Sequence, residues 1–249
     1  MKNQSIKLNC DMGESFGIYK IGMDEKIMPL IDMANLACGF HASDPVTMHQ
    51  SIKLAKEHGV QIGAHPSYPD LSGFGRREMH CSVEEIVSFV IYQCGALDAL
   101  CKSYDVKVTY LKPHGALYNV MMKDEEVFKA IAKAVSKYDN SIKLMILSGA
   151  QNERYAKLAQ KYGISLLYEV FADRAYQDDG SLVPRSQEGA VLHETPQVID
   201  RAKLLLKEEV IESINGKKLP LKTDTLCVHG DTPAALEMVR ELHRLNHED

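Results

Sequence analysis

The chain repeats one pattern from end to end: a short apolar run of strand-like composition, followed by a helix-like segment. No all-polar linker interrupts this alternation, so it predicts a single domain, residues 1–249, built on a parallel sheet. Seven units favour an α/β fold of the (β/α) barrel type, seven-stranded and irregular or incompletely closed. An open doubly wound sheet is the alternative. The strand-like runs are 6–11, 32–38, 60–65, 107–112, 142–147, 164–171 and 225–229.

Four helix starts carry capping signals. Asp44, Thr195 and Thr232 each precede a proline, and such pairs place an N-cap side chain before Pro at the first helical position. Ser82 and Glu85 have capping-box spacing, in which each side chain bonds the other residue's backbone N–H. These signals predict where helices begin between the strands.

Composition argues against several classes of protein. A net charge of −5 without a Lys/Arg-rich block gives no reason to expect a nucleic-acid partner. No apolar run approaches the roughly 18 residues of a membrane span, and the N-terminus lacks a signal-peptide core, so we expect no membrane partner. The six cysteines form no C-x-x-C pair, which is typical of free thiols. We therefore expect a cytoplasmic protein.

Polar and ionisable residues close nearly every predicted strand. Side chains two apart on a strand share a face, and the carboxyl ends of parallel barrel strands meet in one mouth, where active sites of this architecture lie. So many converging polar groups indicate an enzyme. The inward set is Asn9, Asp11, Asn35, His41, Gln61, His65, Lys112, His114, Glu169, Asp173, His229 and Asp231.

Histidines stand at four of these strand ends, at positions 41, 65, 114 and 229. A lone histidine there is commonly a hydrogen-bonded structural residue. Beside Asp11, Asp173 or Asp231, neutral imidazoles could also bind a divalent metal such as zinc, manganese or iron. No H-E-x-x-H motif is present, so the metal stays an open alternative.

Cationic side chains near the same mouth could recognise anions. Lys112 either pairs with a carboxylate such as Asp11 or Glu169, or binds an anionic substrate group. Two long loops, 66–77 and 172–194, carry further guanidinium groups that suit carboxylate or phosphate. Those arginines are Arg76, Arg77, Arg174 and Arg185.

Several motifs of known chemistry are missing from the sequence. It contains no G-x-x-x-x-G-K-[ST] P-loop and no G-x-G-x-x-G dinucleotide fingerprint. A G-x-S-x-G nucleophile elbow is also missing, which argues against serine-hydrolase chemistry.

Seven segments together resemble the LamB/YcsF family, in order and over almost the whole chain. One departure is Ser43, where the family form HAGDP has Gly. The segments are 8–14 (LNCDMGE), 34–45 (ANLACGFHASDP), 62–77 (IGAHPSYPDLSGFGRR), 111–119 (LKPHGALYN), 169–176 (EVFADRAY), 182–185 (LVPR) and 227–232 (CVHGDT).

The resemblance implies a barrel related to glycoside hydrolases and deacetylases. It also implies cleavage of 5-oxo-L-proline to L-glutamate with ATP hydrolysis, in a 5-oxoprolinase whose subunits B and C would be partners of this chain. The resemblance does not fix which residues are catalytic, so we assign residue roles from the positions at the strand ends. We expect Asp11, His65, His114, Asp173 and His229 to be catalytic. We expect substrate binding by Asn9, Glu14, His41, Lys112, Arg174, Arg185 and Asp231.

Two rival functions stay open. A metal-dependent amidohydrolase or carbohydrate deacetylase would act without ATP. A non-catalytic subunit would bind ligand and partners, although such a scaffold has no need of so many converging ionisable groups.

Overall fold

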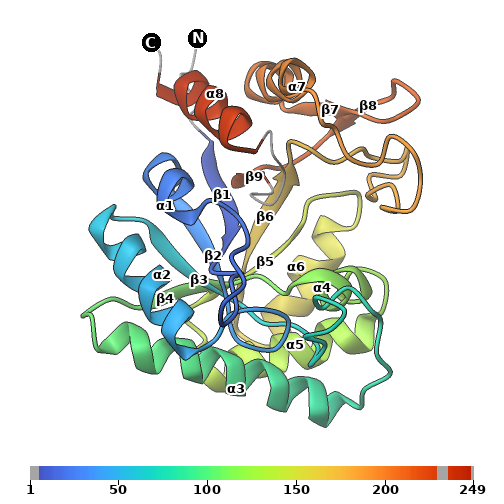
Figure 1. Ribbon diagram of the computed structural model, residues 1–249. Coiled ribbons are helices and arrows are strands. Elements are labelled where there is room, and N and C mark those ends of the chain that lie inside the picture. The colour runs from blue at the N-terminus through green and yellow to red at the C-terminus, as the bar shows by residue number, and fades with distance from the viewer. Residues whose placement is uncertain (1–5, 229–234, 248–249) are drawn as a thin grey trace.

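The computed structural model describes residues 6–228 and 235–247. Seven parallel strands form a closed barrel in the order β1-β2-β3-β4-β5-β6-β9 (Figure 1), and β9 completes it by pairing with both β1 and β6. The predicted seven-stranded barrel is confirmed, and closure rules out the open sheet. The strands are β1 (Lys7–Met12), β2 (Met33–Ala37), β3 (Gln61–His65), β4 (Val108–Leu111), β5 (Lys143–Leu147), β6 (Ser165–Phe171) and β9 (Thr225–Cys227).

Helices surround the barrel, and a short antiparallel hairpin that the sequence patterns did not indicate follows α7. The hairpin strands are β7 (Val210–Glu212) and β8 (Lys218–Pro220). In the part of the chain that the structure describes, no helix is long and apolar enough to cross a membrane. The helical elements are α1 (Asp24–Ile27), η1 (Met28–Leu30), α2 (Pro45–Glu57), α3 (Val83–Lys102), α4 (Gly115–Met121), α5 (Glu125–Tyr138), α6 (Asn152–Lys161), α7 (Thr195–Glu208) and α8 (Ala235–His247).

The capping predictions are confirmed at two helices and wrong at a third. Asp44 accepts hydrogen bonds from two N–H groups at the start of α2, and Ser82 with Glu85 forms the capping box of α3. At α7, the N-cap is Glu194 and Thr195 already belongs to the helix. A proline is tolerated at either of the first two helical positions, because the first four N–H groups of a helix have no intrahelical partner. The Thr-Pro pair therefore does not fix whether Thr195 is the N-cap or the first helical residue. Thr232 lies outside the described residues.

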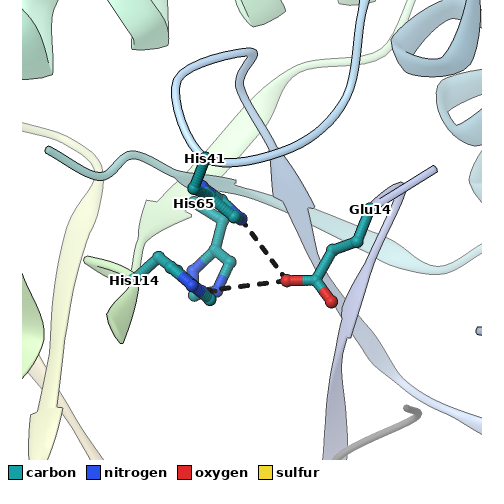
Figure 2. Close-up of side chains that lie close together, drawn as sticks. All are labelled: Glu14, His41, His65 and His114. Carbon is teal, nitrogen blue, oxygen red and sulfur yellow. Dashed lines mark hydrogen bonds and ion pairs between the residues drawn. The ribbon is translucent and has the colours of Figure 1, made fainter. Parts of the chain in front are cut away.

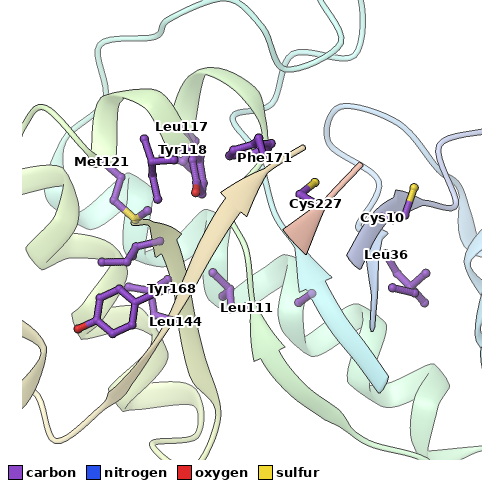
Figure 3. Close-up of a cluster of buried hydrophobic side chains, with 14 of the residues drawn as sticks. Cys10, Leu36, Leu111, Leu117, Tyr118, Met121, Leu144, Tyr168, Phe171 and Cys227 are labelled. Atoms are coloured by element: carbon purple, nitrogen blue, oxygen red, sulfur yellow. The ribbon is translucent and has the colours of Figure 1, made fainter. Parts of the chain in front are cut away.

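The core consists of two parts, one outside the barrel and one inside. The strand residues that alternate with the inward set point outward and pack on the helices, as expected from side-chain alternation. Figure 3 shows this layer between the strands and α4. Inside, Met33, Tyr110 and Met145 form a separate apolar cluster. Met33 and Tyr110 each lie two residues before a polar inward residue, Asn35 and Lys112, so the interior is apolar below the polar groups at the carboxyl ends.

The predicted irregularity lies between β3 and β4, where the register shifts at Gly63. A Cβ atom at Gly63 would lie 2.1 Å from the Tyr110 ring, so glycine is needed there. The ring fills the space, and its hydroxyl donates a 2.7 Å hydrogen bond to Asn35 Oδ1. The irregular step thus delivers a polar group across the barrel, toward the site.

Candidate active site

A buried lysine lies between two carboxylates at the carboxyl end of the barrel. Lys112 Nζ is 3.0 Å from Asp11 Oδ1 and 2.8 Å from Glu169 Oε1. Burial alone lowers the pKa of a lysine, but here the carboxylates outweigh it and hold the pKa of Lys112 well above its usual value. Of the two roles open for Lys112, pairing is the one observed, and the ammonium group stays charged.

Amide side chains beneath this triad fix the Asp11 carboxylate. Asn35 Nδ2 donates to Asp11 Oδ1 and to Asn9 Oδ1, both at 2.8 Å. Asn9 in turn donates to Thr225 Oγ1 at 2.9 Å. Asn9 was predicted to bind substrate; it lies in this layer below Asp11, where its amide is engaged by Asn35 and Thr225.

Three histidines cluster beside Asp11, each from a different strand end (Figure 2). His65 Nδ1 is 2.7 Å from the carbonyl oxygen of Lys112, and His114 Nε2 is 2.9 Å from that of Phe74. The remaining nitrogens, His65 Nε2 and His114 Nδ1, are 3.0 Å apart. His41 stacks on His114 with ring centroids 3.7 Å apart. β2 ends at Ala37, so His41 reaches this mouth from the loop after β2 and not, as expected, from the strand itself.

Glu14, on the loop after β1, faces the same cluster. Its Oε1 atom is 3.3 Å from His41 Nε2 and 3.8 Å from His114 Nδ1, and both contacts end on one oxygen in Figure 2. Burial lowers the pKa values of His41 and His114 well below normal, so both rings are neutral near pH 7. One ligand atom from each of Glu14, His41, His65 and His114 lies within 4.8 Å of the others, so this group could hold a metal ion.

The loop after β3 folds over these histidines. Gly75 has a φ of +64°, and a Cβ atom there would lie 2.7 Å from His114 and 2.8 Å from His41. Asp70 organises the loop by accepting hydrogen bonds from the backbone N–H groups of Gly73 and Arg77 and from the Arg77 guanidinium. The close approach of this loop therefore depends on glycine at position 75, where no Cβ atom fits.

A cavity of about 760 Å³ opens above the site. Its wall combines Asp11, Glu14 and His114 with arginines of the two long loops, Arg76 and Arg185. This volume lies within the range of small-molecule sites, roughly 300–1,000 Å³. The candidate catalytic groups and the candidate anion-binding groups thus share one cavity.

Other predicted site residues on the second long loop have different surroundings. Arg174 lines the cavity, yet it also donates to the carbonyl oxygens of Val183 and Ala190, which ties the loop together. Burial and the nearby Arg185 lower the pKa of Arg174 to about 10. Asp173 is buried next to it. The remaining predictions, His229 and Asp231, lie outside the described residues.

Several residues of the site were missed from the sequence. Tyr118 of α4 lines the cavity and donates a 2.9 Å hydrogen bond to Glu169 Oε2. It follows His114 by four residues, a spacing that places both on one side of a helix start. Asn119 and Asn152 also line the cavity. Asn152 had no comparable signal, because β5 ends on apolar Leu147.

Fold and site define the class: a closed seven-stranded (β/α)-barrel protein with an acid–lysine–histidine site at the carboxyl ends of its strands. The LamB/YcsF family model matches residues 6–249, and the chain belongs to this family.

Similar proteins occur in several bacteria. The 5-oxoprolinase A subunit of Vibrio campbellii is 49% identical over 244 residues, covering 98% of this chain and 96% of that protein. A 5-oxoprolinase A subunit of Pseudomonas aeruginosa is 52% identical over 237 residues, covering 95% of this chain and 94% of that protein. A lactam utilization protein from Thermus thermophilus, known from its crystal structure, is 41% identical in sequence. The two structures align with a TM-score of 0.90 over 97% of this chain and 95% of that protein.

Proposed function

We propose that this chain is the ring-opening subunit of an ATP-dependent 5-oxoprolinase, which converts 5-oxo-L-proline to L-glutamate. One observation carries the proposal. About half of the residues are identical, over nearly the full length of the chain, to those of proteins named as the A subunit of 5-oxoprolinase. The cavity supports it, because it places carboxylate, imidazole and guanidinium groups around one space large enough for a small anionic lactam.

The chemistry explains why ATP is needed. A five-membered lactam is an amide with little ring strain, so its carbonyl carbon is a poor electrophile. Transfer of the γ-phosphoryl group to the lactam oxygen gives an imidate-like carbon that water attacks. The ring C–N bond then breaks as the nitrogen takes up a proton, and a second water hydrolyses the resulting acyl phosphate to glutamate and phosphate.

Asp11 is the proposed general base for the attacking water. Its Oδ1 atom accepts from Lys112 and Asn35, while Oδ2 lies 3.4 Å from His65 Nε2, toward the histidine cluster. The ammonium group of Lys112 keeps the carboxylate ionised. A base held in position on both sides needs little reorganisation when substrate binds, which favours proton transfer.

The anionic groups of the substrate fit the arginine side of the cavity. Arg76 and Arg185 reach the cavity from opposite loops, and guanidinium forks match carboxylate and phosphate geometry. The predicted roles of Arg174, Asp173, His229 and Asp231 stay part of this proposal. We assign phosphorylation to the partner subunits B and C, since the chain has no P-loop.

The experiment is an assay of the purified chain with 5-oxo-L-proline and ATP, with and without subunits B and C. Glutamate and phosphate formed only by the assembled mixture support the proposal. In that mixture Asp11→Asn, which is nearly isosteric, should reduce turnover by at least about 100-fold, the usual contribution of general-base catalysis. Asp98→Asn, on the outer helix α3, is the matched control. Two outcomes would refute the proposal. One is a normal rate of glutamate formation by the assembled enzyme that carries Asp11→Asn. The other is the absence of glutamate with every combination of subunits.

A further inference from the structure

The contacts of two histidines dictate their tautomers. A carbonyl oxygen accepts hydrogen bonds but donates none, so His65 Nδ1 and His114 Nε2 must both carry protons toward the carbonyls of Lys112 and Phe74. In neutral rings, His65 Nε2 and His114 Nδ1 then both present lone pairs. These two nitrogens are 3.0 Å apart, so two acceptors face each other without a donor between them.

Anionic oxygens surround the same point. Asp11 Oδ2 is 3.4 Å from His65 Nε2, and Glu14 Oε1 is 3.8 Å from His114 Nδ1. Lone pairs and carboxylates in one buried place repel each other unless a cation lies among them. A divalent cation bound between these nitrogens and oxygens would turn the repulsion into attraction.

His41 gives an independent indication. His41 is 1% exposed, and neither of its ring nitrogens has a hydrogen-bond partner among the described residues. Its Nε2 atom is instead 3.3 Å from Glu14 Oε1. A buried imidazole without a hydrogen bond is destabilising, and a missing ion is one of the recognised explanations for such a group.

We propose that Glu14, His41, His65 and His114 bind one divalent transition-metal ion. His65 Nε2 and His114 Nδ1 are its principal ligands. The carbonyls of Lys112 and Phe74 are outer partners that hold each ring with the correct nitrogen inward, an arrangement common to metal-binding histidines. Imidazole with carboxylate suits zinc, iron or manganese better than magnesium or calcium.

The site lies at the wall of the cavity, since Glu14, His65 and His114 all line it. An ion there would supply Lewis-acid chemistry, by polarising a carbonyl or lowering the pKa of a bound water. The proposal rests on the ligand geometry and is independent of the proposed 5-oxoprolinase activity. Its test is therefore a binding measurement.

The first measurement is the metal content of purified, chelator-treated and reloaded protein by mass spectrometry, with affinity for Zn²⁺ and Mn²⁺ from titration calorimetry. We expect about one tightly bound ion per chain. Cobalt substitution adds a spectroscopic readout, because Co²⁺ in a site with several imidazole ligands gives visible absorption bands that the hydrated ion lacks.

Variants identify the ligands. Glu14→Gln, His65→Gln and His114→Gln should each weaken binding by at least about tenfold, the lower end of the effect seen even for outer partners. The matched control is His49→Gln with His58→Gln, which removes two exposed histidines of the chain. Unfolding curves verify that each variant is folded, and Glu14→Gln keeps the test valid should a histidine variant fail to fold.

Two results would overturn the proposal. One is the absence of stoichiometric binding of either metal to the folded chain, which would mean that the central cation is a proton shared by His65 and His114. The other is binding that survives in Glu14→Gln and His65→Gln but is lost in the surface control, which would indicate an adventitious site.

Discussion

Lys112 separates two carboxylates that would otherwise repel each other in the barrel. It is 3% exposed and contacts both Asp11 and Glu169. Lys112→Met should therefore lower the free energy of unfolding by about 3–5 kcal/mol, the usual cost of removing one partner from a buried ion pair. Urea denaturation followed by circular dichroism measures this change.

A compensating variant shows whether the loss is electrostatic. Lys112→Met combined with Asp11→Asn and Glu169→Gln leaves no uncompensated charge, so most of the stability should return. Equal instability of the single and triple variants would mean that lost packing, and not charge, dominates.

The sequence predicted the individual residues of the site better than their partners. Alternation along strands correctly grouped Asp11, His65 and Lys112, because parity depends only on local backbone geometry. Their hydrogen bonds depend on the stagger between strands. The stagger therefore decides that Asn35 reaches both Asn9 and Asp11 and that Lys112 reaches across to Glu169, and one chain's sequence does not specify it.

At the scale of elements, the loop after β3 must approach the histidines closely. Gly75→Ala introduces a Cβ atom that overlaps His41 and His114. Gly59→Ala is the matched control: its φ of +67° is similar to the +64° of Gly75, but nothing lies within 4 Å of the added atom. Both variants should lose about 1–2 kcal/mol from the left-handed backbone conformation.

Gly75→Ala should lose about 1–3 kcal/mol more than its control, the typical cost of overpacking. Chemical denaturation of both variants measures the difference. If the two lose equal stability, the loop moves away from the histidines without cost, and its close contact with them is not required.

Asp44 links the start of α2 to the loop that follows Glu14. Its carboxylate accepts from Gly17 N–H and caps α2. The hydrogen bond from Gly17, followed by that from Thr47, lowers the pKa of Asp44 from 3.8 to about 2. Because the folded pKa is lower, the charged carboxylate stabilises the fold above pH 3.8, and this contribution is lost as the pH falls toward 2.

Asp44→Asn keeps a good N-cap but cannot titrate. Its unfolding free energy should therefore depend less on pH in this acidic range than that of the parent chain. Asp44→Ala should in addition lose about 1 kcal/mol at neutral pH through the missing cap. Unfolding at several pH values tests both statements, and parallel curves for Asp44→Asn and the parent would contradict the first.

At the scale of the molecule, the repeat of strand and helix was enough to predict the barrel, since a parallel sheet needs helical crossovers. Closure was less certain because β9, the strand that completes the barrel, spans Thr225–Cys227 alone. Hairpin β7–β8 gave no clear signal, because three-residue strands are too short for a periodic pattern.

Closure of the barrel also brings two arginines together at the wall of the cavity, although the chain as a whole has a negative net charge. The net charge is −5, yet Arg76 and Arg185 reach the cavity from loops more than one hundred residues apart in sequence. If they bind the substrate carboxylate or phosphate, salt should screen the attraction, with a Debye length of about 10 Å at 0.1 M. The KM for 5-oxo-L-proline in the assembled enzyme should rise severalfold as ionic strength increases.

Arg76→Ala and Arg185→Ala should each raise KM at low salt and reduce its salt dependence, because less attraction remains to be screened. Lys203→Ala is the control: it removes one positive charge from α7, where Lys203 pairs with Asp200 at the surface. Steady-state kinetics at several salt concentrations distinguish the two cases. A control that changes KM as much as the arginine variants do would mean that the net charge of the chain, and not this wall of the cavity, attracts the substrate.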